Sequence, residues 1–291
     1  MSWRTVVISS RCKLDLKMGY MVIRGEQVKR IFLDEIAIVI IENPAVSMTG
    51  CLLSELIEHK IKVIFCDSKH SPQAELLPYY GCHDTSRKIR AQLDWSEFIK
   101  GAVWGEIIAE KIRKQAEFLL ETGHLREADM LNGYVSQLQF QDSTNREGHA
   151  AKVYFNATFG MEFTRDRPCA VNAALNYGYS ILLSAFNREV AANGYLTQLG
   201  LHHGNVFNRY NLSSDLMEPF RIIIDKTVYA LAPKELDKAT KRILLDTLNS
   251  YVFVSGEKQT VLNAIGIYVR SVFEALNAQE LERIKFWKYE L

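Results

Sequence analysis

The feature that most constrains the fold of this chain is a change in hydrophobic period between residues 72 and 85. Before it, residues 13–17 alternate polar and apolar side chains, as a strand with one wet face does. Residues 36–41 are apolar on both sides, which is typical of a strand buried on both faces. After it, apolar side chains recur at helical spacing. We therefore expect an α+β fold, with a small β-sandwich-like N-terminal domain over residues 1–71, a linker over 72–85 and a larger all-α domain over 86–291.

Helix signals place further elements within this frame. Thr49 is a suitable N-cap, and Leu52, Leu53, Leu56 and Ile57 form one apolar stripe, so we expect one helix inside the β domain. The linker is indicated by two prolines and a glycine between residues 71 and 81. In the α domain we expect long amphipathic helices over 86–121 and further helices over 125–140, 145–160, 170–193, 214–231, 235–250 and 258–276.

Composition excludes several classes of protein. The longest aliphatic run, residues 36–41, is far shorter than the ~20 residues of a membrane span, so no membrane association is expected. Five scattered cysteines without a CxxC pair argue against a disulfide framework or a zinc site and favour a cytoplasmic location. A net charge of +1 argues against coating nucleic acid over the whole surface, but leaves room for a local basic groove.

Three short motifs hold the candidate functional residues. Glu147 is followed by small side chains at Gly148, Ala150 and Ala151, which would leave an open face for a metal or a substrate on a helix. Taken alone, this motif is better interpreted as a helix start capped by Ser143 or Thr144.

The second motif is the histidine pair His202-His203 in a loop between Gly200 and Gly204, where a ligand or acid–base role and a structural role are equally compatible with the pattern. In the third, Asp215 and Glu218 are three residues apart and would share a helix face. They also have the spacing of a capping box.

Taken together, these motifs suggest one site made of Glu147, His203 and Glu218, with Asp215 near. One imidazole and two carboxylates favour Mg²⁺ or Mn²⁺ over zinc or copper. Such an ion can clamp a phosphodiester and stabilise its transition state. A Ser-His-Asp order, a GxxxxGK[ST] motif and a GxGxxG motif are all missing from the sequence, which argues against nucleotide-hydrolysing motors and dinucleotide enzymes.

These residues, in this order, resemble the CRISPR-associated spacer-acquisition integrase, the universal first protein of CRISPR loci, in its type II form. The resemblance covers essentially the whole chain. It is densest in the segments 145–151, 176–179, 200–203 and 214–221. The family has a small β domain, through which members dimerise, and an α-helical catalytic domain.

The resemblance implies a metal triad of Glu147, His203 and Glu218, which would also be the catalytic residues. The family's ligand histidine lies three residues after the motif glycine, so Gly200 points to His203 and leaves His202 in the variable position. Glu218 is preferred to Asp215 as the metal ligand. We assign Asp215 to helix capping or to orienting a metal ligand through a hydrogen bond.

The implied activity is a transesterification in which the 3′-hydroxyl ends of captured spacer DNA are joined to the leader–repeat junction. The implied partners are double-stranded DNA, a second copy of the chain, and the small second CRISPR-associated protein in a heterohexamer. In type II systems a ring-shaped accessory protein and the effector nuclease also take part. DNA contacts are predicted for Arg146, Lys152 and Arg221, with surface ion pairing as the alternative for each. Tyr20 is predicted either to stack on a duplex end or to pack within its strand.

Two rival interpretations remain at this stage. A stand-alone, structure-specific, metal-dependent DNA nuclease would use the same triad without joining DNA. A binding or scaffolding module would use the carboxylates only to cap helices. Product topology separates the first rival from an integrase, and the effect of removing Glu147 or Glu218 on DNA processing separates the second.

Overall fold

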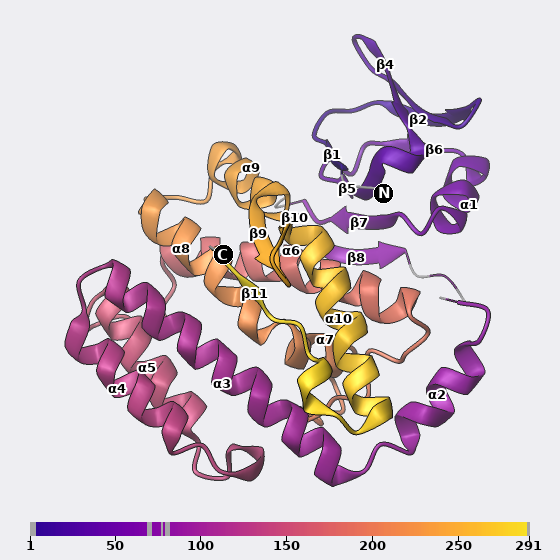
Figure 1. The fold of residues 1–291 in the computed structure, drawn as a ribbon. Helices are drawn as coiled ribbons and strands as arrows, with labels where there is room; N and C mark the ends of the chain where they lie inside the picture. The colour runs from indigo at the N-terminus through magenta and orange to yellow at the C-terminus, as the bar shows by residue number, and fades with distance from the viewer. Residues whose placement is uncertain (1–3, 69–71, 77, 79–81, 290–291) are drawn as a thin grey trace.

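The structure, a computed structural model, describes residues 4–68, 72–76, 78 and 82–289 (Figure 1). The strand-rich first part is followed by a larger, mostly helical part, as the change in period predicts. Among the described residues, none of the helices is long and apolar enough to cross a membrane.

In its described residues, the first part contains two four-stranded sheets, one α-helix and a 3₁₀ turn at Leu33–Glu35. One sheet has the order β1-β5-β7-β8 and the other β4-β3-β2-β6. Helix α1 (Gly50–Glu58) begins after Thr49, whose hydroxyl accepts a hydrogen bond from the backbone N–H of Leu52, as the sequence predicts. The strands are β1 (Arg4–Ile8), β2 (Lys13–Lys17), β3 (Tyr20–Arg24), β4 (Val28–Phe32), β5 (Ile36–Ile41), β6 (Ser47–Met48), β7 (Lys62–Cys66) and β8 (Pro72–Leu76).

Strand β5 lies between two hydrophobic cores. Val39 and Ile41 belong to the smaller core, which the two sheets and α1 share. Ile38 and Ile40 belong to the larger core, which is made mostly by the helices. All six residues of β5 are buried, and the strand is parallel to both β1 and β7. The β part is therefore packed onto the helical part through a common sheet.

The predicted linker over 72–85 is wrong at its beginning. Residues 72–76 form β8, which pairs antiparallel with β7 at the edge of the sheet. Proline has no N–H to donate, and Pro72 is tolerated because it is the first residue of an edge strand. Residues 77 and 79–81 of the predicted linker lie outside the described residues, and α2 begins at Thr85.

The helical part is arranged around α3, which packs against α4, α5, α8 and α10 (Figure 1). The helices predicted over 125–140, 145–160, 170–193 and 235–250 are confirmed with shifted ends, and the 86–121 stretch is divided into two helices before Glu97, where the side chain of Ser96 caps α3. The helices are α2 (Thr85–Leu93), α3 (Glu97–Glu121), α4 (Leu125–Ser136), α5 (Arg146–Phe159), α6 (Ala170–Ala192), α7 (Asn211–Leu216), α8 (Arg221–Leu231), α9 (Lys238–Asp246) and α10 (Val261–Ala278).

The second part is not all α. A three-stranded antiparallel sheet has the order β10-β9-β11, from β9 (Tyr251–Val254), β10 (Glu257–Thr260) and β11 (Trp287–Lys288). Its hairpin turns at Ser255 and Gly256, both with positive φ, which suits a tight two-residue turn. The helix predicted to start at 258 begins only after Thr260, whose hydroxyl caps α10.

The helix predicted over 214–231 is broken. Helix α7 ends at Leu216, a 3₁₀ turn covers Glu218–Phe220, and α8 starts at Arg221. Pro219 cannot donate a backbone hydrogen bond, so a continuous α-helix is disfavoured at this point. The break places Glu218 at a bend rather than on a helix face.

We expect the two parts to unfold together because β5 serves both cores. Ile40→Ala and Ile41→Ala remove neighbouring side chains that face the larger and the smaller core respectively, and each should cost about 2–5 kcal/mol of unfolding free energy. Urea unfolding followed by helical circular dichroism should show the loss for both variants. An Ile41→Ala variant with an unchanged helical transition would show that the β part unfolds independently.

Candidate active site

Glu147 lies in the first turn of α5, where the helix start directs it toward α3. Asn145, just before the helix, is in the left-handed region with φ 52°. The carboxylate of Asp142 accepts hydrogen bonds from the backbone N–H groups of Arg146 (2.7 Å) and Glu147 (2.9 Å). Asp142, rather than the predicted Ser143 or Thr144, therefore accepts hydrogen bonds from the otherwise unpaired N–H groups at the start of the helix.

The predicted open face beside Glu147 is wrong in part. Ala150 is fully buried in the larger core, so its small side chain serves helix packing. Gly148 is exposed, but a Cβ there would lie 2.7 Å from the side-chain oxygen of Asn145. Ala150 thus serves the core, and Gly148 makes room for the Asn145 side chain at the start of the helix.

Glu218, at the bend between α7 and α8, is almost completely buried. Its Oε1 is 2.8 Å from Arg221 Nη2, and its Oε2 is 2.6 Å from the Nζ atom of Lys111 on α3. Burial raises the pKa of a carboxyl group, but the charges of Arg221 and Lys111 outweigh burial and hold the pKa of Glu218 below its ordinary value. Glu218 is therefore held as an anion inside the protein.

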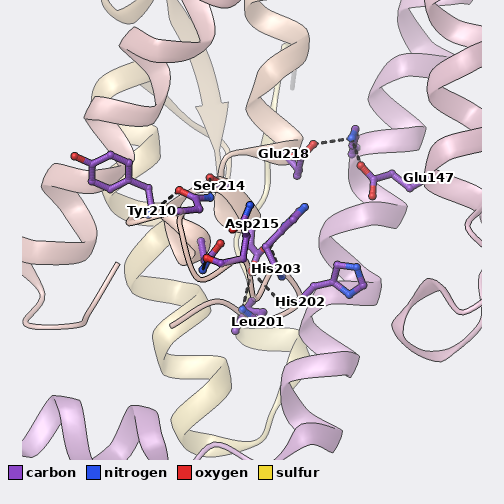
Figure 2. Close-up of polar contacts among 12 residues, drawn as sticks. Glu147, Leu201, His202, His203, Tyr210, Ser214, Asp215 and Glu218 are labelled. Atoms are coloured by element: carbon purple, nitrogen blue, oxygen red, sulfur yellow. Dashed lines mark hydrogen bonds and ion pairs between the residues drawn. The ribbon is translucent and has the colours of Figure 1, made fainter. Parts of the chain in front are cut away.

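Lys111 joins the two predicted carboxylate ligands. Its Nζ atom is 2.5 Å from Glu147 Oε1 as well as 2.6 Å from Glu218 Oε2. Figure 2 shows Glu147 and Glu218 facing each other from separate segments, with a nitrogen between their oxygens. Burial would lower the pKa of Lys111, but the charges of Glu218 and Glu147 outweigh it and raise that pKa.

His203 is held by Asp215 (Figure 2). Asp215, fully buried near the end of α7, accepts hydrogen bonds from the backbone N–H groups of Leu201 (2.6 Å), His202 (3.1 Å) and His203 (3.4 Å). Its Oδ1 also contacts Nδ1 of His203, and this hydrogen bond raises the pKa of the imidazole. The prediction that Asp215 caps a helix is thus wrong. The other predicted role, in which Asp215 orients the His203 ring through a hydrogen bond, matches the geometry.

Gly200 explains how the loop approaches Asp215 so closely. A Cβ at this position would lie 2.3 Å from the carbonyl oxygen of His203 and 2.8 Å from Asp215 Oδ2. Only glycine fits that space without moving the backbone. The glycine of the motif is therefore required for the His203–Asp215 contact.

His202 and His203 have different environments. The His202 ring stacks on Trp104 of α3, with centroids 4.6 Å apart and planes within 1°. His203 meets the same indole edge-on at 5.7 Å. Because Nδ1 of His203 faces Asp215, its Nε2 is the nitrogen that remains for a ligand.

The residues fit a hard divalent cation in donor type, but the three predicted ligands are not assembled around one point. The described part of the chain contains no group of three His, Cys, Asp or Glu side chains positioned to hold a metal ion. Glu147 and Glu218 converge on one cationic nitrogen, that of Lys111, as two carboxylates would on a metal. His203 points its Nδ1 to Asp215 and interacts with the two glutamates through their charge.

A cavity of about 180 Å³ lies beside Glu218. Lys111, Arg165 and Arg221 contribute cationic groups to its lining, which also includes the buried residues Tyr179 and Asp225. The Tyr179 hydroxyl donates a hydrogen bond to Asp225, whose pKa burial raises to about 6. The guanidinium groups of Arg165 and Arg221 stand 5.3 Å and 4.9 Å from the Tyr179 ring centroid.

The four residues predicted to contact DNA differ in exposure and in the contacts that their side chains already make within the protein. Arg221 is engaged by Glu218, and Arg146 stacks 5.7 Å from the Tyr134 ring. Lys152 is exposed on α5. Tyr20 is 40% exposed and packs on Phe32 with centroids 5.2 Å apart. Their roles in DNA binding stay predictions.

Lys111 and Trp104 are the site residues that sequence reasoning missed. A signal was present, because Trp104, Ile108, Lys111 and Gln115 recur at helical spacing along one side of α3. A lysine on a buried stripe requires an anionic partner. The sequence does not say which of 34 acidic residues supplies it.

Comparison with known proteins identifies a family and related folds. Residues 5–242 match the family described as CRISPR associated protein Cas1. The chain is 35% identical to the CRISPR-associated endonuclease Cas1 of Neisseria meningitidis serogroup C (strain 8013), over 98% of this chain and 96% of that relative.

Two solved structures share the fold. A casposase bound to an integration product superposes with a TM-score of 0.77 at 19% identity, covering 96% of this chain and 91% of that chain. A chain of a Cas6-RT-Cas1–Cas2 complex superposes with a TM-score of 0.77 at 18% identity, covering 98% of this chain, which spans 36% of that longer chain. The family match and the near full-length relative confirm the resemblance seen in the motifs: the chain belongs to the CRISPR-associated Cas1 family.

Proposed function

We propose that this chain is the metal-dependent DNA integrase of CRISPR adaptation, joining the 3′-hydroxyl ends of captured spacer DNA to the leader–repeat junction. Membership of the Cas1 family supports the class of activity, since the Neisseria relative is named an endonuclease. The observation that carries the proposal is the convergence of Glu147 and Glu218, 2.5 Å and 2.6 Å from one cationic nitrogen. Two carboxylates held this close to each other need a cation between them. In a metal-dependent phosphodiester reaction, that cation is a divalent metal ion.

Glu147, Glu218 and Nε2 of His203 are the groups that would hold Mg²⁺ or Mn²⁺. A bound ion of this kind neutralises charge on the scissile phosphate and on the leaving oxygen. Asp215 holds the His203 ring through Nδ1, which fixes the ring's orientation and leaves Nε2 for the ion. Arg221 keeps Glu218 ionised, because its guanidinium stabilises the carboxylate inside the protein.

Transesterification conserves the number of phosphodiester bonds. The incoming 3′-oxygen forms a bond to phosphorus, the bond from phosphorus to the target's 3′-oxygen breaks, and the proton of the attacking hydroxyl ends on the departing one. An external energy source is therefore unnecessary. The protein's task is to align the two oxygens with phosphorus and to stabilise the extra negative charge.

Partners are proposed on the same basis. We assign double-stranded DNA, both spacer precursor and leader–repeat, to the surface around Arg146, Lys152 and Tyr20. We assign a homodimer to the β part. A heterohexamer with the small second CRISPR-associated protein is supported by the similarity in fold to a chain of a Cas1–Cas2 complex. The type II accessory ring protein and the effector nuclease complete the proposed set.

A stand-alone structure-specific nuclease is the alternative that uses the same residues. Supercoiled target DNA, a spacer-like duplex and Mn²⁺ should yield covalently joined DNA when the small partner protein is present. If only cut DNA forms under these conditions, the nuclease alternative replaces the integrase.

Glu147→Gln should abolish joining while the fold is retained. Losing a metal ligand removes several kcal/mol of transition-state stabilisation, which is at least about 100-fold in rate. Glutamine keeps the shape of the side chain, and Lys111 stays paired with Glu218, so the fold should be retained. Glu162→Gln, at an exposed position, is the control with the same change of charge. Full joining by Glu147→Gln would favour a binding or scaffolding protein instead.

Asp215→Asn should move the titration of His203 to lower pH. The Asp215 hydrogen bond raises the pKa of His203, so the imidazole keeps its proton to higher pH than it would alone. Because a metal binds only the neutral ring, metal binding by the native protein should increase as pH rises through that raised pKa. Nuclear magnetic resonance of the histidine Cε1 protons without metal measures the shift, with His203→Gln for assignment and Asp246→Asn as the distant control. An unmoved His203 titration would contradict the assigned role of Asp215.

A further inference from the structure

We propose that Lys111 is a resident counterion, which holds Glu147 and Glu218 together until a divalent cation takes the place of its ammonium group. This inference deepens the proposed function, on which it depends for the metal. It assigns a positioning role to a residue that lies on none of the three motifs.

The Nζ atom of Lys111 lies where a cation bound by both glutamates would lie. Its Nζ atom is 2.5 Å from Glu147 Oε1 and 2.6 Å from Glu218 Oε2, and only 11% of its side chain is exposed. The adjacent Ile112 and the residue one turn back, Ile107, are fully buried, so the helix backbone beneath Lys111 is fixed by the core. The flexible part is the four-carbon side chain, which can swing while the helix stays in place.

The charge balance explains why a cation is needed. Glu147 and Glu218 carry two negative charges, and Lys111 and Arg221 carry two positive ones. Arg221 forms an ion pair with Glu218 through the other carboxylate oxygen. Without Lys111 the two facing carboxylates would repel each other in a poorly solvated place. A divalent cation meets the same need with twice the charge.

The displaced ammonium group has a place to go. The cavity of about 180 Å³ beside Glu218 is lined by Lys111 and Asp225, and also by the cationic side chains of Arg165 and Arg221. A lysine that moves there stays close to an acidic group and leaves the space between the glutamates. Movement of this one side chain is then enough to open the space between the two glutamates.

Two other roles for Lys111 lead to different results. A purely structural ion pair would keep the carboxylates in place for the metal, so removing it would weaken metal binding. A phosphate contact would affect DNA binding and leave metal affinity unchanged. A resident counterion competes with the metal, so removing it should strengthen metal binding.

Lys111→Met tests this directly, because methionine has a similar shape and no charge. Isothermal titration of the full chain with Mn²⁺ should show affinity higher by about tenfold or more than that of the native chain. In EDTA the melting temperature of Lys111→Met should fall by on the order of 5–10 °C, and Mn²⁺ should restore most of it. Lys100→Met is the control, since Lys100 lies on the same helix and pairs with Glu97 near the surface. Equal or weaker Mn²⁺ binding by Lys111→Met would overturn the proposal.

A second variant keeps the test decisive if Lys111→Met does not fold. Adding Glu147→Gln removes one of the two repelling charges. If Lys111→Met folds in EDTA, the double variant should melt at a higher temperature than Lys111→Met; if Lys111→Met does not fold, the double variant should regain a cooperative melting transition. A double variant that melts no higher than Lys111→Met, or that also fails to fold, would overturn the counterion role. If the native chain binds no Mn²⁺ at all, the proposed metal-dependent function fails, whereas this comparison in EDTA still tests the role of Lys111.

Discussion

The arrangement of the site depends on one physical constraint: charges taken out of water must be paired with opposite charges. Glu218 is nearly fully buried, and it is surrounded by Lys111 and Arg221. Asp215 is fully buried, and it binds three backbone N–H groups and the His203 ring. These pairings join segments far apart in sequence, so helix α3, the loop 200–205 and the bend before α8 take up fixed positions relative to one another.

The fold was predictable where its signal is local. Alternation in β2, the doubly apolar β5 and the apolar stripe of α1 depend on residues a few positions apart, and all three appear as expected. Strand β8 was missed because its proline signals a turn, although Pro72 occupies the one place in an edge strand where a missing N–H costs nothing. The β9–β10 hairpin was missed because four-residue strands beside a helix give too short a pattern.

The site was predictable in its residue types but not in its assembly. The motifs identify Glu147, His203 and Glu218, whereas the contacts that organise them come from Lys111 and from Asp142, which satisfies the start of α5. Sequence spacing also misassigned Ala150, because small residues on a helix suit close packing as well as an open face. Which acidic group pairs with a buried lysine is decided by tertiary packing, and single-sequence patterns do not contain that information.

Net charge describes this protein poorly because the functional charges are local. The whole chain carries +1, and the four charged groups joined by ion pairs at Lys111 and Glu218, namely Glu147, Glu218, Lys111 and Arg221, sum to zero. A neutral site has little attraction for a phosphodiester. A divalent cation makes the same site positive, and the displaced ammonium group remains nearby with its charge. Metal binding and attraction of the DNA backbone are therefore coupled in the proposed function, and by linkage DNA that favours the charged site must favour metal binding equally.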